Sequence, residues 1–296
     1  MSGITRTAPP LTERLPPHAW FLVSAVFHYL GPSFAVLLFA RLSPAAVAWL
    51  RIAAAGCVFA AWRRPWRTFV ALPSRERRTI VALGIVLAMM NTVFYEAIAR
   101  LPLASVGAIE FLGPIGVAAS GARTRRNLAA LLFAVGGAGL LTEVRLTGEP
   151  LGYLFAFANS VLFVGYILLG HRISAGGAGI GGVDRLAGAM LVATFAALPF
   201  GFGGALPAFS NPALLGAAAG VGISSSVIPY VCDQLAMRRL PRASFALLLS
   251  LLPASAAVIG AVVLRQIPEP MEALGIVLVI VGVALHQVAV PEADRR

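Results

Sequence analysis

The chain has 296 residues, of which 59% are hydrophobic and only 12% are charged, with a formal net charge of +11. So little polar surface excludes a water-soluble globule of this size and favours a protein that lies in a lipid bilayer. Its 23 basic residues are all arginine and fall in short gaps between apolar runs, which is typical of membrane topology signals and not of a nucleic-acid-binding face.

The first 18 residues form a proline-rich tail that contains Arg6, Glu13 and Arg14. They lack the basic start, short apolar core and small-residue cleavage site of a secretory signal peptide. We therefore predict a cytoplasmic tail over residues 1–18 and a second short one over 291–296.

Ten apolar runs follow, each long enough to cross the ~30 Å hydrocarbon core of a bilayer as a helix. The predicted spans are 19–40, 44–62, 79–99, 103–121, 127–143, 150–170, 186–204, 212–236, 242–264 and 270–290. The predicted fold class is an all-α integral membrane protein with ten transmembrane helices.

The arginines test this assignment, because successive loops must lie on alternate sides of the membrane. Eighteen of them fall in the two tails and in the loops after the second, fourth, sixth and eighth spans, whereas four fall in the other loops. Because arginine is enriched in cytoplasmic loops, both termini are predicted to be cytoplasmic.

A stretch over residues 90–121 recurs over residues 228–260 at an offset of 139 residues. Identical residues pair at ten positions: Ala97 with Ala236, Arg100 with Arg239, Leu101 with Leu240, Pro102 with Pro241, Ala104 with Ala243, Ser105 with Ser244, Leu112 with Leu251, Pro114 with Pro253, Ala118 with Ala257 and Gly121 with Gly260. This predicts a duplicated unit of five helices, over 19–143 and again over 150–290. Because five is an odd number, the second copy must be inverted in the membrane, with a substrate cavity between the two repeats.

Ionisable residues at membrane depth are costly and mark candidate sites. Arg51 lies seven residues from Pro44, at the outer end of the second span, and Glu110 lies seven from Leu103, at the outer end of the fourth. Both side chains are therefore predicted at a depth of about 10 Å from the same side of the membrane. Two alternatives remain open: a structural ion pair, or a cavity in which Arg51 binds a substrate carboxylate and Glu110 an ammonium group or a coupled proton. Glu96 and Asp233 lie nearer helix ends and are predicted to reach water.

Polar residues at helical spacing mark a second set of candidates. Asn91 and Tyr95 share one face of the third span, Ser226 and Tyr230 share one face of the eighth, and the repeat places Asn91 on Tyr230. These residues either join helices by hydrogen bonds or line a site at the repeat interface. The further candidate lining residues are aromatic: Tyr29, Phe94, Tyr166 and Phe245.

Two spans carry residues that disturb a helix. Gly31-Pro32-Ser33, after His28, predicts a break in the first span, and Ser224, Ser225 and Ser226 with Pro229 predict a loosened eighth span.

The sequence holds no metal-protease, nucleophile-elbow or nucleotide-binding motif and no Cys/His cluster with metal-ligand spacing. We therefore expect no enzyme activity, no cofactor and no metal site. The expected partners are a small-molecule substrate and membrane lipid, with the protein a monomer or a homodimer.

The stretch from Asn91 to Ala118, with F-Y-x-A-I-x-x-L-P-L followed by A-I-E-F-L-G-P, resembles the EamA-type branch of the drug/metabolite transporter superfamily. The stretch from Ser226 to Gly260, with I-P-Y, A-M-x-R-L-P and L-x-S-x-x-P-A-x-A, is similar to the same branch, as is A-W-L-R around Arg51. The likeness is closest to the threonine/homoserine exporters, with the aromatic amino-acid exporters as relatives. One departure is Leu252, at a place where members often carry glutamate.

This resemblance implies a bacterial inner-membrane protein that exports amino acids or similar metabolites and uses the proton gradient. The inverted repeats predict alternating access, and Glu110 is the candidate for proton coupling because a carboxyl group at membrane depth suits a proton carrier. The alternatives are an efflux carrier for drugs or cationic and aromatic metabolites, and a passive amino-acid channel.

Overall fold

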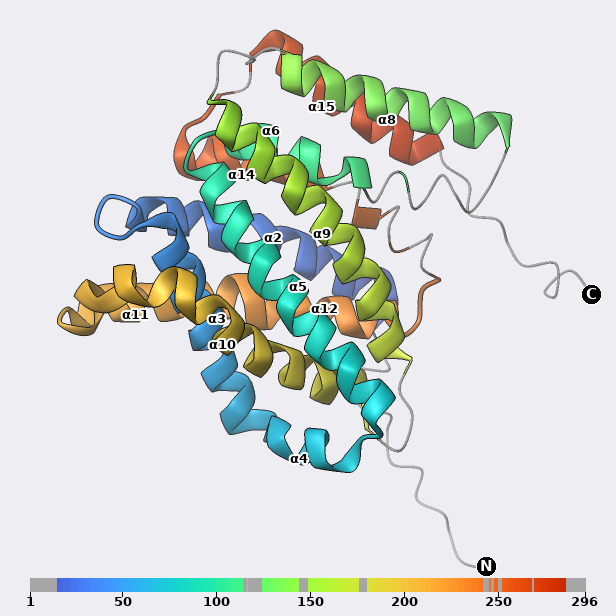
Figure 1. The fold of residues 1–296 in the computed structure, drawn as a ribbon. Helices are drawn as coiled ribbons and strands as arrows, with labels where there is room; N and C mark the ends of the chain where they lie inside the picture. Colours follow the sequence, from blue (N-terminus) through green and yellow to red (C-terminus); the bar gives the residue numbers. More distant parts are fainter. Residues whose placement is uncertain are drawn as a thin grey trace, which may run out of the picture.

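The computed structural model describes residues 15–113, 116, 124–143, 149–175, 180–241, 245, 248–249, 252–267 and 269–285, and every secondary-structure element among them is a helix (Figure 1). The elements are α2 (Pro17–Leu38), α3 (Pro44–Arg63), α4 (Pro65–Ala71), α5 (Ser74–Ile98), α6 (Leu103–Glu110), α8 (Arg125–Glu143), α9 (Pro150–Ser174), α10 (Gly182–Phe209), α11 (Pro212–Gly222), the π-helix η1 (Ile223–Val227), α12 (Ile228–Met237), α14 (Leu252–Leu264) and α15 (Pro270–Leu285). The predicted all-helical class is confirmed.

Six helical segments in the described part are long and apolar enough to cross a membrane. They are α2, α3, α5, α9, α10 and the continuous segment Pro212–Met237, which joins α11, η1 and α12. Helices α6, α8, α14 and α15 occupy the other four predicted segments, in which several residues or side chains lie outside the described part. The count of ten spans therefore stays a prediction.

Several predicted features fall on residues outside the described part. These are most of the N-terminal tail, the tail over 291–296 and, among the matched repeat positions, Pro114, Ala118, Gly121, Ala243, Ser244 and Leu251.

Helix starts follow from local sequence. Ser43 and Asn211 each precede a proline, and their side chains accept hydrogen bonds from the backbone N–H groups of Ala46 and Leu214, at 3.3 and 3.1 Å. This is the usual arrangement of an N-cap residue followed by proline in the first turn, where the missing N–H costs nothing. Helix α4, which the sequence analysis did not predict, begins directly after α3, because Arg64 turns the chain with a left-handed φ of 50°.

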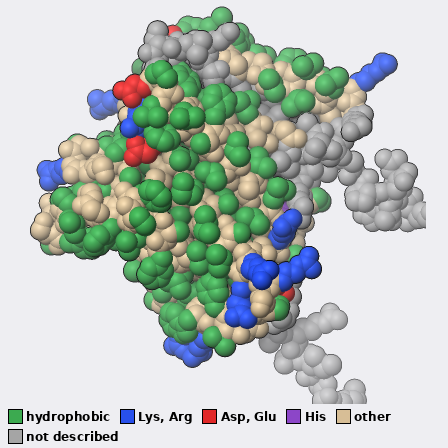
Figure 2. Space-filling model, viewed as in Figure 1, with side chains coloured by type: hydrophobic (Ala, Val, Ile, Leu, Met, Phe, Trp, Pro, Cys, Tyr) green, Lys and Arg blue, Asp and Glu red, His purple; other side chains and the backbone are tan. Residues whose placement is uncertain are grey.

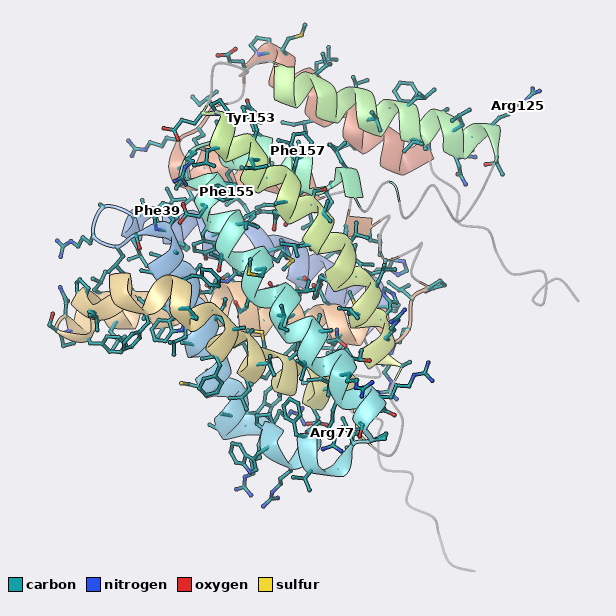
Figure 3. The ribbon with its side chains drawn as sticks, viewed as in Figure 1. Phe39, Arg77, Arg125, Tyr153, Phe155 and Phe157 are labelled. Carbon is teal, nitrogen blue, oxygen red and sulfur yellow. The ribbon has the colours of Figure 1, made fainter. Side chains whose placement is uncertain are left out.

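Polar contacts tie the loops together at two ends of the bundle. At one end, which we call the arginine-rich end, Arg185 pairs with Glu76 at 2.5 Å and Arg63 with Asp184 at 3.5 Å. At the opposite end, Arg100 pairs with Glu149 at 3.4 Å. Figure 3 shows Arg77 at the arginine-rich end, with Phe39 and Phe155 towards the other.

Large apolar side chains cover the outside of the bundle between these ends. Leu22, Val161, Phe195 and Val262 are each more than 60% exposed, and hydrophobic side chains dominate the face seen in Figure 2. Such a surface is suited to lipid and not to water.

Helices from distant parts of the sequence pack together inside the bundle. Helix α5 packs against α9 and α10, α12 packs against α2, α3 packs against α10, and α8 packs against α15 (Figure 1). Among the almost fully buried aromatic side chains of the described interior are four tyrosines: Tyr29, Tyr95, Tyr166 and Tyr230.

The predicted break in the first span is wrong, because α2 continues through Pro32 to Leu38. The glycine has a different role. A Cβ atom on Gly31 would collide with Ser225, so the missing side chain lets α2 and η1 pack in direct contact. The predicted loosening of the eighth span is confirmed, because residues 223–227 form a π-helix.

Candidate functional site

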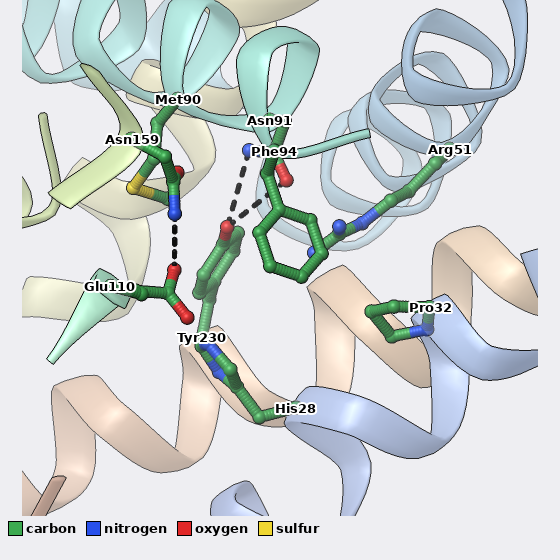
Figure 4. Close-up of a pocket in the computed structure, with 9 residues that line it drawn as sticks. All are labelled: His28, Pro32, Arg51, Met90, Asn91, Phe94, Glu110, Asn159 and Tyr230. Atoms are coloured by element: carbon green, nitrogen blue, oxygen red, sulfur yellow. Dashed lines mark hydrogen bonds between the residues drawn. The ribbon is translucent and has the colours of Figure 1, made fainter. Parts of the chain in front are cut away.

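A small cavity lies inside the bundle where six helices meet. Its free volume is about 10 Å³, which is on the order of the room one water molecule needs. Side chains from α2, α3, α5, α6, α9 and α12 line it: His28, Pro32, Arg51, Met90, Asn91, Phe94, Glu110, Asn159 and Tyr230 (Figure 4).

Glu110 contributes a carboxylate to this cavity from the end of α6. Its side chain is 2% exposed. Tyr29 Oη donates to Oε2 at 2.9 Å and Asn159 Nδ2 donates to Oε1 at 2.8 Å, while Ser160 Oγ donates to the backbone carbonyl at 3.0 Å. Each carboxylate oxygen is thus held by a neutral donor, which fixes its position without an arginine or lysine partner.

Arg51 contributes the cationic group from α3, and its side chain is held by the π-helix. Its Nε donates to Ser226 Oγ at 2.7 Å and its Nη2 donates to the carbonyl oxygen of Ser225 at 2.6 Å. That carbonyl needs a donor because Pro229, four residues later, has no N–H group. The guanidinium also lies 5.3 Å from the ring centroid of Tyr95, a cation–π distance.

The ion pair between Arg51 and Glu110, one of the two sequence alternatives, is not formed. In the described part of the chain no salt bridge joins them, because each is held by neutral partners on its own side of the cavity. Figure 4 shows the two groups on either side of the cavity, with Phe94 and Tyr230 between them. A guanidinium and a carboxylate therefore face the same enclosed space without neutralising each other directly.

Asn91 and Tyr230 complete the cavity wall between α5 and α12. Asn91 Nδ2 lies 3.2 Å from Tyr230 Oη, and Tyr230 Oη lies 3.4 Å from Asn91 Oδ1. The same amide nitrogen donates to the carbonyl of Leu87 at 2.7 Å. These bonds fix the ring of Tyr230 against the cavity.

Two cavity-lining residues carry buried polar atoms that have no hydrogen-bond partner among the residues described. They are His28 Nδ1 and Asn159 Oδ1. Unsatisfied buried polar atoms are uncommon in proteins and are expected where a ligand or water binds. Their presence at the wall of this cavity favours a polar ligand.

Other predicted site residues lie behind the cavity wall or away from it. Tyr29, Tyr95 and Ser226 contact Glu110 or Arg51 and position them. Tyr166 is behind Tyr230, with ring centroids 5.4 Å apart. Phe245 does not line the cavity, because it packs with Phe21 at 6.2 Å and His171 at 5.5 Å, in another part of the core.

Glu96 and Asp233 differ from each other in the structure. Glu96 lies at the end of α5, is partly exposed and pairs with Arg100 at 2.5 Å, in keeping with a helix-end position. The prediction that Asp233 reaches water is wrong, because its side chain is fully buried. Ser24 Oγ donates to its Oδ1 at 2.5 Å and Tyr166 Oη donates to its Oδ2 at 2.6 Å.

Sequence analysis did not select Asn159 or Met90 as lining residues. Asn159 is an amide side chain in the middle of an apolar span, at position 10 of the 25-residue helix α9, and that depth was the available signal. Met90 carries no such signal, because an apolar side chain in an apolar helix gives no indication of which way it faces.

Comparison with known proteins agrees with the architecture. Residues 150–286 match the EamA-like transporter family. The threonine/homoserine exporter RhtA of Escherichia coli is 30% identical over 253 residues, which cover 83% of this chain and 82% of that protein. The exporter of the same name from Salmonella typhimurium is 29% identical over 282 residues, or 92% of each chain.

A solved structure described only as "Crystal structure of protein" shares the fold, with a TM-score of 0.62 and 18% identity over 90% of this chain and 96% of its own. The relatives and the family are transporters and not enzymes. The chain is thus a multi-pass membrane protein that belongs to the EamA-type transporters of the drug/metabolite transporter superfamily.

Proposed function

We propose that this protein exports a zwitterionic amino acid of the threonine or homoserine class across the bacterial inner membrane. The observation that carries the proposal is the placement of Arg51 and Glu110 at one cavity, where the described residues form no salt bridge between them. An amino acid carries both a carboxylate and an ammonium group, so it can satisfy both side chains at once. The two relatives of about 30% identity are named threonine/homoserine exporters, which supports the same substrate class.

In this proposal Arg51 binds the carboxylate, and Glu110 binds the ammonium group or carries a coupled proton. The Arg51 guanidinium already donates from Nε to Ser226 Oγ and from Nη2 to the Ser225 carbonyl. Its other N–H groups can donate to a substrate carboxylate. Asn159 Oδ1 and His28 Nδ1 supply further polar contacts. Phe94 and Tyr230 supply apolar surface for the side chain of the substrate.

The free volume of about 10 Å³ is too small for any amino acid. Substrate binding therefore requires the helices around the cavity to move apart, as alternating access demands. The structure corresponds in this proposal to a closed form between the states open to each side.

We further propose that the movement follows from two inverted five-helix repeats, over 19–143 and 150–290. The packing supports this, because contacts between the two halves have counterparts in which the halves exchange places. Helix α5 packs on α9 as α12 packs on α2, and α6 packs on α9 as α14 packs on α2. Helices at equivalent positions also contact each other: α3 with α10, α6 with α14 and α8 with α15. The membrane orientation, with both termini cytoplasmic, is part of the same proposal.

The test of the substrate is counterflow in proteoliposomes. Vesicles are loaded with an unlabelled amino acid, and uptake of the labelled compound is followed at equal pH on both sides. A carrier for threonine accelerates labelled uptake when threonine is trapped inside, whereas a passive channel does not. A panel of neutral, aromatic and charged amino acids defines the substrate class.

The competing substrate class is a cationic or aromatic drug. Growth of cells with and without the protein, in toxic concentrations of threonine, homoserine and a set of cationic dyes, separates the two. Resistance to the dyes with no counterflow of any amino acid would replace this proposal with the drug-efflux alternative.

The membrane orientation is tested by cysteine labelling. In a chain without Cys57 and Cys232, Arg67→Cys and Thr124→Cys are expected to react from the cytoplasmic side and Arg41→Cys from the outside. Labelling of positions 67 and 124 from opposite sides would contradict the predicted fourth span and the odd number of helices per repeat.

A further inference from the structure

A second buried carboxylate, Asp233, lies outside the cavity. It is on α12, 0% exposed, and four residues from the end of that helix at Met237. At 1.5 Å per residue this places it about 6 Å from the arginine-rich end of the bundle. Neither the substrate cavity nor the proposed contacts with an amino acid use it.

The partners of Asp233 are two hydroxyl groups from two other helices. Ser24 on α2 donates to Oδ1 and Tyr166 on α9 donates to Oδ2. Within the described ranges Asp233 forms no salt bridge. A buried carboxylate in a membrane protein without a counter-ion is costly and marks a proton or ion pathway by default.

Among the described residues, the surroundings of Asp233 supply no fixed positive charge. The side chains that act on Asp233 are Ser24 from α2 and Tyr166 from α9, and the charge of Asp233 in turn acts on Tyr166 and on Tyr230 and Cys232 from α12 itself. On α10, Asp184 and Arg185 instead form salt bridges with Arg63 and Glu76. The remaining titratable groups on the packed helices are His18, His28 and Tyr29 on α2 and Tyr153, His171 and Arg172 on α9. His28 lines the substrate cavity, Tyr29 bonds Glu110, the Nδ1 atom of His171 lies 3.0 Å from the carbonyl of Ile167, and Arg172 is exposed.

Hydroxyl partners suit a group that changes its protonation state. Serine and tyrosine hydroxyls can donate or accept, so they donate to an ionised Asp233 and accept from a protonated one by rotating. An arginine partner could only hold the ionised form. One carboxylate and two hydroxyls are also too few for a hard cation, since the sites of such ions use about six oxygen ligands.

We propose that Asp233 carries the coupled proton, which leaves Glu110 to bind the substrate ammonium group. Protonation forms an O–H bond at one Asp233 oxygen, with a proton taken from water that enters when the bundle is open at the opposite end. Release breaks this O–H bond and returns the proton to water when the bundle opens at the arginine-rich end. This inference rests on the proposed transport function and assigns the two carboxylates separate roles.

The link to the substrate cavity runs through Tyr166. This side chain bonds Asp233, and its ring centroid lies 5.4 Å from that of Tyr230, which lines the cavity. The Ser24 and Tyr166 bonds also join α2, α9 and α12 at the arginine-rich end. Hydrogen bonds to an ionised carboxylate are stronger than those to a neutral one, so a proton on Asp233 loosens the junction between these three helices.

The experiment compares counterflow with gradient-driven transport in the same proteoliposomes. Asp233→Asn keeps the size of the side chain but cannot exchange a proton. We expect its counterflow of labelled threonine at equal pH to stay within about threefold of wild type. The stimulation of transport by an imposed pH gradient should be at least tenfold smaller than in the wild type. Asp184→Asn, the same change at a half-buried surface ion pair, is the matched control and is expected to keep both activities.

Tyr166→Phe provides a second variant in case Asp233→Asn does not fold. It keeps the ring against Tyr230 but removes the hydroxyl. We expect counterflow to be retained, the stimulation by a pH gradient to be reduced, and the pH profile of gradient-driven transport to be shifted. Asp233→Glu is expected to restore part of the gradient response.

The outcomes separate this inference from the proposed function. Counterflow together with an unchanged gradient response in both Asp233→Asn and Tyr166→Phe overturns the role of Asp233 and leaves the exporter assignment intact. Wild-type counterflow that ignores a pH gradient, or that responds to a sodium gradient instead, also overturns it. Absence of wild-type counterflow for every amino acid removes the proposed substrate, and this inference with it.

Discussion

The side chains of Asn91 and Tyr230 are hydrogen-bonded to each other although the residues stand 139 positions apart, which is the offset of the internal repeat. Residues related by a two-fold axis can touch only where they lie close to that axis. The contact therefore supports a pseudo-two-fold axis that passes beside the cavity, and both residues line that cavity.

A double-mutant cycle on Asn91 and Tyr230 tests whether this contact holds the two halves together. We expect Asn91→Ala and Tyr230→Phe to be non-additive, with a coupling free energy of about 0.5–1.5 kcal/mol, as for a buried neutral hydrogen bond. The measurement is the free energy of unfolding in detergent for the wild type, both single variants and the double variant. Additive effects would show that the two side chains do not support each other.

Arg51→Lys is expected to raise the KM for threonine roughly 10- to 100-fold, because lysine keeps the charge but loses the fork that binds Ser226 and a carboxylate together. Threoninol, which lacks the carboxylate, should compete much more weakly than unlabelled threonine for transport by the wild type. In Arg51→Lys the two compounds should compete about equally. Arg100→Lys, at the partly exposed pair with Glu96, controls for the substitution. An unchanged KM in Arg51→Lys would remove Arg51 from the substrate site.

Glu110→Gln is expected to weaken threonine counterflow at least tenfold. The amide oxygen can still accept from Asn159 and the amide nitrogen can donate to Tyr29 Oη, with that bond reversed, but the side chain offers no charge to an ammonium group. The effect should be present at equal pH on both sides of the membrane. Glu96→Gln serves as the control at a partly exposed helix end. A variant that keeps full counterflow but no longer responds to a pH gradient would instead assign proton coupling to Glu110, as the sequence alternative allows.

Gly31→Ala is expected to destabilise the protein by about 1–3 kcal/mol, because its Cβ atom collides with the backbone and side chain of Ser225 in η1. Gly220→Ala is the matched control in α11, where a Cβ atom meets no described atom within 4 Å. There the change should be neutral or stabilising by roughly 0.5–1 kcal/mol, since alanine is the better helix former. Thermal unfolding in detergent measures both, and equal shifts of Tm would contradict the close packing of α2 on η1.

The helical class, the approximate positions of the helices and the chemistry available in the membrane all follow from the amino-acid sequence alone. Apolar runs of about 20 residues allow little besides a helix across a bilayer, because every backbone N–H must find its partner within the segment. The motifs around Glu110 and Tyr230 likewise indicate the transporter family. Because charge is rare in the membrane, Arg51 and Glu110 stand out in the sequence as candidate site residues.

Which of these polar groups meet depends instead on how the helices pack. Depth along a helix is readable from sequence, but the direction in which a side chain faces in an apolar span is not. Arg51 and Glu110 share a depth and could have formed a salt bridge, yet Ser226, the Ser225 carbonyl, Tyr29 and Asn159 hold them apart. Asp233 lies near a helix end and could have reached water, but α2 and α9 close over it with two hydroxyl groups. Both outcomes depend on contacts between helices that are distant in the chain, which no local pattern encodes.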